Sequence, residues 1–418
     1  MPFGMVGFCL SRFAYWVSIS SWSCLVSTKY LKSTARKSMK VLFLIGSIGD
    51  YHTARLKDLE DRLSRENIRL SVLVMNRNSE DNLHRKYQNE AIDAVGIKWR
   101  YLGGGGRQQG YVKFTARLLG EISREAPDLI ATIGYNFSYS IVGLIYRLIK
   151  RRNRIIFCAD SKFDDGLRRP SREIVKSLLA RMYDGAIVAG RRQSHYFQFL
   201  GIPAENIRVG YDVVDNDAFM KAAGVARQRD IEYRAQLKLP EKYIVCVSRL
   251  VARKRVDRVI DAYARSQARE KGIFLVVIGS GALEQDLRAR CDRQGVADWV
   301  IFKQLVPNRD MPIFLSLARF LILLSDYDQW GLCLNEALAC GTPVLCTDRC
   351  GAAHELVRHG ENGFVTDGTE SDIDLGVRTL LDDDIYVKIK SRYPWNLRDW
   401  NLQRFSENVL NFAKGLSK

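Results

Sequence analysis

Short apolar runs alternate with longer amphipathic stretches along most of this chain. Near-continuous apolar strands separated by helices of roughly 10 to 20 residues are typical of parallel sheets that helices cover on both faces. A first series of runs is followed by a charged stretch at 221–242, after which the pattern restarts. The runs lie at 41–46, 70–75, 129–134, 154–159, 185–190 and 206–210, and then at 243–248, 274–279, 299–302, 320–325 and 343–347. The pattern predicts an α/β chain with two facing Rossmann-like domains joined by a polar segment.

These runs also predict the domain boundaries. The first domain is expected at 39–220 and the second at 221–392. The segment 393–418 has Leu402, Phe405, Val409 and Phe412 at helical spacing. It is therefore expected to form an amphipathic helix that packs back on the fold.

Residues 1–38 do not follow the pattern. They are mildly apolar and aromatic, but Arg12 and several serines interrupt them, and no basic region precedes the apolar stretch. They therefore resemble neither a membrane span nor a signal peptide. We expect a tail or a misassigned start outside the fold, with a weak interfacial anchor as the alternative.

Composition narrows the class of protein. The chain has nine cysteines without CxxC pairs or zinc-type spacing, which favours a reducing, cytoplasmic compartment over a disulfide framework. Its net charge of +17 suits nucleic acid, anionic lipid or a phosphorylated partner. Because no RNA-binding aromatic signature or helix-turn-helix pattern is present, we expect no nucleic-acid partner.

Ligands of open α/β sheets bind beyond the carboxyl ends of the strands, so the loops that follow the predicted strands are the candidate sites. Arg249 directly follows one strand and Lys254 comes five residues later. Two such cations can bind a diphosphate, although a solvated basic surface would have the same composition. Gly279 and Gly281 end the next strand, where they could admit a ligand or only close a tight turn. Val306 lies in a later loop that could equally be a plain connection.

The stretch "DYDQWGLCLNEALACGTPV" (326–344) carries the densest candidate chemistry. A helix that begins near Gly331 would direct the free N–H groups of Trp330, Gly331 and Leu332 at an anion. Glu336, about 7.5 Å further along the axis, could accept hydrogen bonds from ribose hydroxyls. Asp328, before the helix, could accept from another polyol. For either carboxylate alone, a helix cap or a surface position is the simpler interpretation.

Together these residues resemble a known family. Arg249-x4-Lys254, Gly279-x-Gly281 and Asp328-x7-Glu336 followed by "ALACGTPV" are similar to the retaining, family-4-type (group 1) glycosyltransferases of the GT-B fold. The segments 181–219 and 351–365 add to the resemblance, which extends from about Met39 to the tail helix.

The resemblance implies roles for these residues. Arg249 and Lys254 would bind the donor diphosphate, Glu336 the ribose, and Asp328 the hydroxyls of the transferred sugar. The family most often has Glu where Asp328 stands, and many members have His in the loop where this chain has Asp160. Asp160 could contact the sugar or cap a helix.

The N-terminal half contributes weaker candidates. Gly46 and Gly49 would let the loop after the first strand approach a donor phosphate or an acceptor, and His52 is a candidate acceptor contact or a solvated side chain. The glycines at 103–106 form a flexible loop on the acceptor side or a simple linker.

The expected activity follows from this resemblance. We expect transfer of a hexose from a nucleoside diphosphate sugar to a glycan or lipid-linked acceptor, without a cofactor or metal. The basic and apolar stretches at 147–154 and 166–182 could dock on an anionic membrane at the inner face of the plasma membrane, or could be solvated helix faces. The alternatives are an inactive GT-B-like binding or scaffold subunit and, less favoured because the third glycine of the dinucleotide motif is missing, a NAD(P)-dependent oxidoreductase.

Overall fold

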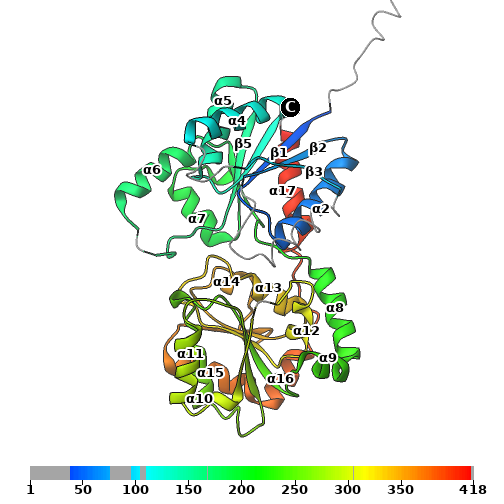
Figure 1. Cartoon of the computed structure of the whole chain (residues 1–418), viewed down its shortest axis with the longest axis vertical. Coiled ribbons are helices and arrows are strands. Elements are labelled where there is room, and N and C mark those ends of the chain that lie inside the picture. The colour runs from blue at the N-terminus through cyan, green and yellow to red at the C-terminus, as the bar shows by residue number, and fades with distance from the viewer. Residues whose placement is uncertain (1–37, 76–95, 104–109, 167, 305, 416–418) are drawn as a thin grey trace, which may run out of the picture. The chain divides into compact units, whose positions relative to one another are not determined.

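The computed structural model describes residues 38–75, 96–103, 110–166, 168–304 and 306–415. The predictions for residues 1–37 and for the glycines at 104–106 lie outside these ranges. Figure 1 shows the described chain as two parallel sheets with helices around each.

The first sheet has the strand order β3-β2-β1-β4-β5-β6-β7, and all its paired strands are parallel. Strands such as β1 and β5 are buried along almost their whole length, as expected for a sheet covered on both faces. The strands are β1 (Lys40–Ile45), β2 (Arg69–Val74), β3 (Lys98–Tyr101), β4 (Leu129–Ile133), β5 (Arg154–Ala159), β6 (Gly185–Val188) and β7 (Ile207–Val209). The helices are α2 (Asp50–Arg65), α4 (Tyr111–Glu125), α5 (Ser138–Lys150), α6 (Pro170–Ala180), α7 (Arg191–Phe199) and the short η1 (Ala204–Asn206).

The second sheet has the order β10-β9-β8-β11-β12-β13 and is also parallel. Its strands are β8 (Tyr243–Val247), β9 (Phe274–Ile278), β10 (Val300–Lys303), β11 (Leu321–Leu323), β12 (Val344–Thr347) and β13 (Gly363–Thr366). The helical segments that precede, follow or cover them are α8 (Asn216–Gln228), α9 (Asp230–Leu237), η2 (Ala252–Lys254), α10 (Val256–Arg265), α11 (Glu284–Arg293), η3 (Ala297–Trp299), α12 (Met311–Ser316), α13 (Leu332–Ala339), α14 (Ala353–Leu356), α15 (Glu370–Leu381) and α16 (Asp383–Lys390). The last helix is α17 (Leu402–Lys414). The predicted two-sheet α/β architecture is therefore confirmed.

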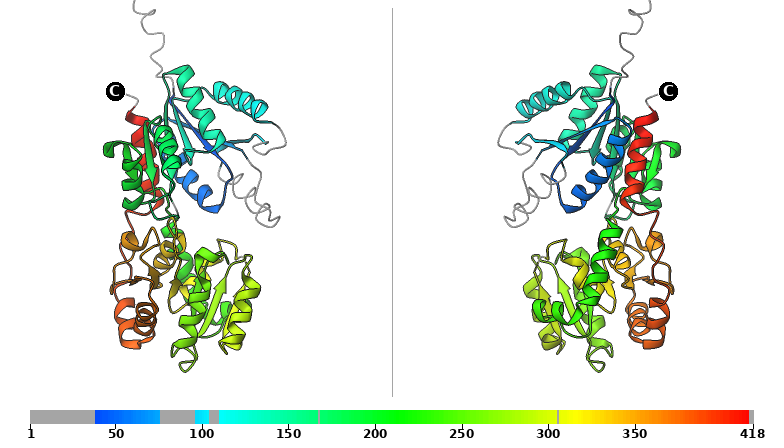
Figure 2. Two further views of the ribbon diagram at one scale, coloured as in Figure 1. Left: turned by 90° about the vertical axis from the view of Figure 1, so that its left-hand side faces the viewer. Right: turned by 90° about the vertical axis from the view of Figure 1, so that its right-hand side faces the viewer.

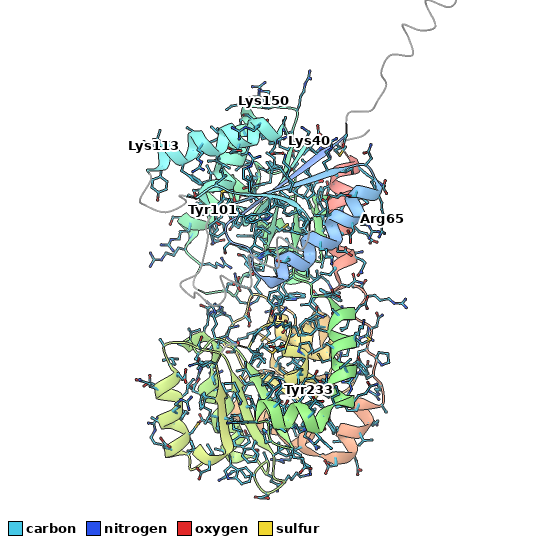
Figure 3. All side chains as sticks on the ribbon, turned by 45° about the vertical axis from the view of Figure 1, so that its right-hand side comes forward. Lys40, Arg65, Tyr101, Lys113, Lys150 and Tyr233 are labelled. Atoms are coloured by element: carbon cyan, nitrogen blue, oxygen red, sulfur yellow. The ribbon has the colours of Figure 1, made fainter. Side chains whose placement is uncertain are left out.

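The charged stretch at 221–242 is not the polar connection that the sequence suggested. It forms most of α8 and all of α9, which begin after Asp215 accepts a hydrogen bond from the Ala218 N–H (3.0 Å). Phe219 and Ala223 on α8 are buried in the core of the second sheet. Tyr233 on α9, labelled in Figure 3, packs against that core from outside. The hydrophobic pattern did not reveal these two helices, because α8 buries only Asn216, Phe219, Ala223 and Ala226, and α9 has no fully buried residue.

The C-terminal segment forms a helix that packs back on the fold, as its apolar spacing predicted, and the surface it packs on belongs to the first sheet and its helices. Helix α17 lies against α2, which the two views of Figure 2 show from opposite sides. The Ser406 hydroxyl donates to Asp58 (2.5 Å), and Glu407 pairs with Arg62 (2.8 Å). Leu402 and Phe405 are buried beneath these polar contacts. Within the described ranges, no helix combines the length and apolar character needed to cross a membrane.

Candidate functional site

Loops at the carboxyl end of the second sheet bring most of the predicted donor residues together. Lys254 ends η2 after β8, Asp328 follows β11, and their side chains form an ion pair. The two side chains are only 11% and 10% exposed, so water screens the pair weakly. Arg249 also follows β8, and it is exposed to solvent. Of the two candidate cations after β8, Lys254 is therefore held by a carboxylate, and Arg249 faces the solvent.

Gly279 and Gly281 hold the Arg249 loop in place. A Cβ at Gly279 would lie 2.0 Å from the Ser248 carbonyl oxygen, and a Cβ at Gly281 would lie 2.3 Å from that of Leu250. Both obstacles are backbone atoms, which cannot rotate away as a side chain can. The Leu250 N–H also donates to the Ser280 carbonyl (2.9 Å). The two glycines therefore let the loop after β9 pack directly on the loop that carries Arg249.

This packing gives a first testable prediction. Gly281→Ala should lower the free energy of unfolding by about 1–3 kcal/mol, because either the loop or Leu250 must shift. Chemical denaturation measures the loss. The matched control is Gly224→Ala on α8, where a Cβ would meet nothing within 4 Å, and where alanine should be neutral or stabilising. Equal stability of the two variants would contradict the close approach.

Helix α13 begins where the sequence predicted. Gly331 precedes its first residue with φ of 95°, a left-handed conformation that favours glycine. Trp330 and the apolar residues of α13 are buried in the core, so the start of the helix is held rigidly. Gly341, the predicted stop, follows the C-cap with φ of 73°.

Glu336 is buried in the second turn of α13 rather than lying on the surface. It is 1% exposed, and the Tyr51 hydroxyl donates a hydrogen bond of 2.7 Å to its Oε1. Burial raises the pKa of Glu336 to about 7, and the hydrogen bond from Tyr51 opposes that rise. Burial and the Glu336 carboxylate together raise the pKa of the nearby Cys333 thiol, while Lys254 lowers it. Glu336, Lys254 and Asp328 are therefore all near enough to Cys333 to influence its pKa.

Asp160, after β5, also reaches this region. Its Oδ1 accepts a hydrogen bond from the Gln329 side chain (3.2 Å), and it does not cap α6, whose N-cap is Arg169. Burial and the Asp212 carboxylate raise the pKa of Asp160 to about 7. Asp212 in turn pairs with the buried Arg55 (3.4 Å). The structure thus gathers carboxylates from both sheets around Asp328.

The remaining candidate residues make packing or hydrogen-bond contacts within the fold. A Cβ at Gly46 would lie 3.3 Å from the Tyr139 hydroxyl, so the loop after β1 packs closely there. Gly49 is the N-cap of α2, and its N–H donates to Nδ1 of His52 (3.2 Å). Burial and then Arg55 lower the pKa of His52 to about 3, which keeps its ring neutral. Val306 packs partly buried against the core of the second sheet.

Several polar residues of the site were not identified from the sequence. Tyr51 lies directly after the glycine loop at 46–49 but has no motif of its own. Gln193 on α7 is fully buried and donates to the Gln329 carbonyl (2.6 Å). A Cβ at Gly351 would lie 1.9 Å from that same carbonyl oxygen and 2.8 Å from the Gln193 amide. The only sequence signal was their position after predicted strands.

In the ranges that the structure describes, no group of three or more His, Cys, Asp or Glu side chains is placed to hold a metal ion.

Part of the chain matches a known protein family. Residues 228–393 match the family described as glycosyl transferases group 1. Over 257 residues the chain is 29% identical to the GDP-mannose-dependent alpha-(1-6)-phosphatidylinositol monomannoside mannosyltransferase of Mycobacterium tuberculosis, covering 58% of this chain and 65% of that protein. It is 26% identical over 192 residues to the N-acetyl-alpha-D-glucosaminyl L-malate synthase of Bacillus anthracis, covering 46% of this chain and 48% of that one. The matches thus span less than two thirds of these relatives.

Solved structures share the fold over most of the chain. Anabaena HepE in complex with UDP and glucose superposes with a TM-score of 0.70 at 20% identity, covering 90% of this chain and all of that one. A glycosyltransferase from Rickettsia africae gives 0.72 at 11% identity, covering 91% of this chain and all of that one. Residues 228–393 are thus similar to the group 1 glycosyl transferases, and the chain shares with these solved structures the GT-B fold of two parallel sheets.

Proposed function

We propose that this protein transfers a hexose, with retention of anomeric configuration, from a nucleoside diphosphate sugar to an acceptor hydroxyl. One observation carries the proposal: the largely buried Lys254–Asp328 ion pair lies beyond the carboxyl ends of the strands of the sheet that matches the family, and Asp328 lies just before the helix that carries Glu336. Cations, a helix N-terminus and buried carboxylates together suit a ligand that is anionic in its centre and hydroxylated at both ends.

Each residue takes one part of the donor. Arg249 and Lys254 bind the diphosphate, which also faces the N-terminus of α13. Glu336 accepts hydrogen bonds from the ribose, and Asp328 accepts from hydroxyls of the transferred sugar. The Asp328–Lys254 ion pair supports this assignment, because it sets the sugar ligand beside the phosphate ligand.

The reaction would depend on stabilising the departing diphosphate. As the bond from the anomeric carbon to the phosphate oxygen breaks, negative charge grows on that oxygen, where Arg249, Lys254 and the helix dipole lower its energy. The acceptor hydroxyl attacks from the same face, and its proton passes to the departing phosphate. Because protein cations supply the positive charge, the proposed reaction requires neither a resident cofactor nor a metal.

The acceptor is proposed to be a surface glycan or a glycolipid, used in the cytoplasm at the inner face of the plasma membrane. The Mycobacterium relative is named for action on a phosphatidylinositol derivative. In this chain Leu148 and Ile149 on α5 are 55% and 64% exposed beside basic residues. Figure 3 labels two of the exposed lysines of this region, Lys113 on α4 and Lys150 at the end of α5. Apolar side chains among lysines and arginines suit an anionic membrane surface.

A nucleotide screen tests the proposed donor. UDP, GDP and ADP, each in excess, should include one that raises the unfolding temperature by roughly 5–10 °C at about 100 times its Kd. Differential scanning fluorimetry measures the shift, and Glu336→Ala should lose most of it. Stabilisation by none of the three would overturn the proposal.

The two alternative functions, an inactive scaffold subunit and an oxidoreductase, predict different experimental results. A GT-B-like scaffold subunit would bind a nucleotide sugar but would neither transfer nor hydrolyse it over hours of incubation. A nicotinamide cofactor that copurifies with the chain would instead support an oxidoreductase.

A further inference from the structure

An apolar groove lies on the first sheet's side of the molecule, between α6 and the end of α7. Its volume is about 580 Å³, within the range of pockets that hold small ligands. Ile174 and Leu178, one turn apart on α6, form one wall, and Phe163 and Phe199 form the other. These four side chains are 62%, 63%, 44% and 61% exposed. Large apolar residues that are exposed together and line one groove mark a binding surface.

Contacts between neighbouring elements hold the walls of the groove in place. The Ser177 hydroxyl donates to the Leu200 carbonyl (2.8 Å), which ties α6 to the end of α7. The rings of Phe163 and Phe199 are 5.1 Å apart, and Phe163 also contacts Tyr196 edge-on at 5.1 Å. The walls are therefore held by polar and aromatic contacts that leave their apolar surface open.

The charges around the groove are mainly positive. Arg168, whose guanidinium lies 4.5 Å from the centre of the Tyr196 ring, and Arg181 line it directly. Arg169 and Arg172 are exposed at the start of α6. Glu173, the acidic residue of the lining, is already paired with Lys176 (2.6 Å). The rim is thus suited to an anionic group, and the interior to hydrocarbon.

The groove begins close to the candidate site. Phe163 follows Asp160 by three residues, so their Cα atoms are at most about 11 Å apart. A molecule with its polar head near Asp160 would therefore have to span only about this distance to reach Phe163 at the groove. A soluble glycan would gain no binding free energy from these apolar walls, whereas a hydrocarbon chain would bury its apolar surface against them.

We propose that this groove holds a hydrocarbon chain of a lipid-linked, phosphate-bearing acceptor while the acceptor's hydroxyl lies in the site. The proposal rests on the proposed function and narrows its acceptor to a lipid. It is distinct from general membrane attachment, because it assigns one chain to one groove.

A photoreactive lipid tests the proposal. The probe is a lysophosphatidylglycerol with a diazirine near the end of its single chain, used below its critical micelle concentration so that no bilayer is present. Irradiation of the full chain followed by peptide mass spectrometry should place most of the label on α6, Phe163 and Phe199. Unlabelled lysophosphatidylglycerol should compete for labelling, and glycerophosphoglycerol, which lacks the chain, should not.

Two variants of α6 form the matched pair. Leu178→Asp places a charge in the groove and should reduce labelling at least tenfold. Val175→Asp adds the same charge at a residue that is 56% exposed but does not line the groove, and should change labelling less than twofold. Both positions are exposed, so both variants should fold, which unchanged unfolding temperatures would verify.

Three results would overturn the proposal: label spread evenly over the surface, equal loss in both variants, or a concentration-dependent dimer in light scattering that Leu178→Asp abolishes. The nucleotide screen is independent of this experiment. Groove labelling without any nucleotide response would refute the transferase and keep a lipid site, and the reverse result would keep the transferase and refute the groove.

Discussion

Lys254→Ala should slow glycosyl transfer by about 100- to 1,000-fold, the usual effect of removing one donor that stabilises a developing anion. It should also lower the free energy of unfolding by up to about 3–5 kcal/mol, because Asp328 would remain largely buried without its cation. Lys254→Arg keeps the charge and should retain most of the stability. Urea denaturation and a donor-consumption assay measure the two effects separately.

A double-mutant cycle separates the structural from the catalytic role of Lys254. Lys254→Ala combined with Asp328→Ala removes both charges, so much of the lost stability should return. Binding of the nucleoside diphosphate without its sugar should stay weak in this double variant. In Asp328→Ala alone, where Lys254 is kept and its ion pair and the proposed sugar ligand are lost, that binding should be nearly normal. Normal nucleotide binding by Lys254→Ala would show that the lysine is only the partner of Asp328.

Hydrophobic periodicity was sufficient to predict the central strands, because strands buried on both faces are almost continuously apolar. The two strands that it missed, β3 and β13, both lie at sheet edges. β3, with the sequence KWRY, has no fully buried residue. β13 begins with Gly363, where a Cβ would lie 2.3 Å from the Val344 carbonyl oxygen, and this need for glycine is not visible in the local sequence pattern.

The candidate site was predictable only where its residues follow strands in a recognisable order. Arg249, Lys254, Asp328 and Glu336 could be grouped because parallel strands bring their carboxyl ends to one edge. Their partners could not be found in this way. Tyr51 contacts Glu336 across 285 residues, and the Arg55–Asp212 pair joins positions 157 apart. Such contacts arise from packing between elements, which spacing along one strand or helix does not encode.

The burial of Glu336 was the other property that could not be predicted from the sequence. A carboxylate near a helix start is usually at the surface, and Glu336 looked no different from such a residue in isolation. In the structure its pKa is near 7 because α13 is sunk into the core. This burial is unfavourable for folding at neutral pH, as expected where a binding group is held away from water.

Glu336→Gln should therefore make the protein more stable and its nucleotide binding weaker. The folded state keeps the Glu336 proton up to a pH of about 7, whereas the unfolded chain loses it near the ordinary value of 4.5. The folded state thus binds more protons in this interval, and the wild-type free energy of unfolding falls as the pH rises from about 4.5 to 7. Glutamine removes this contribution, so the variant should be more stable by up to about 3 kcal/mol above pH 7. Below pH 4.5 the two proteins should be nearly equal.

Binding should change in the opposite direction. The ionised Glu336 accepts hydrogen bonds from two ribose hydroxyls, so wild-type affinity for the nucleoside diphosphate should rise as the pH passes through about 7. The glutamine variant should bind about 10- to 100-fold more weakly at pH 8, since hydrogen bonds to a charged group are lost, and should lack this rise. Denaturation and titration calorimetry between pH 4.5 and 8.5 measure both profiles.

The Tyr51→Phe variant is the matched control, because it keeps the carboxylate and removes the hydrogen bond that lowers its pKa. Its stability and binding transitions should both move to higher pH than in the wild type, in the same direction and by a similar amount. Movement of one profile without the other would mean that Glu336 does not govern both. A glutamine variant with unchanged affinity would remove Glu336 from the donor site, whatever its effect on stability.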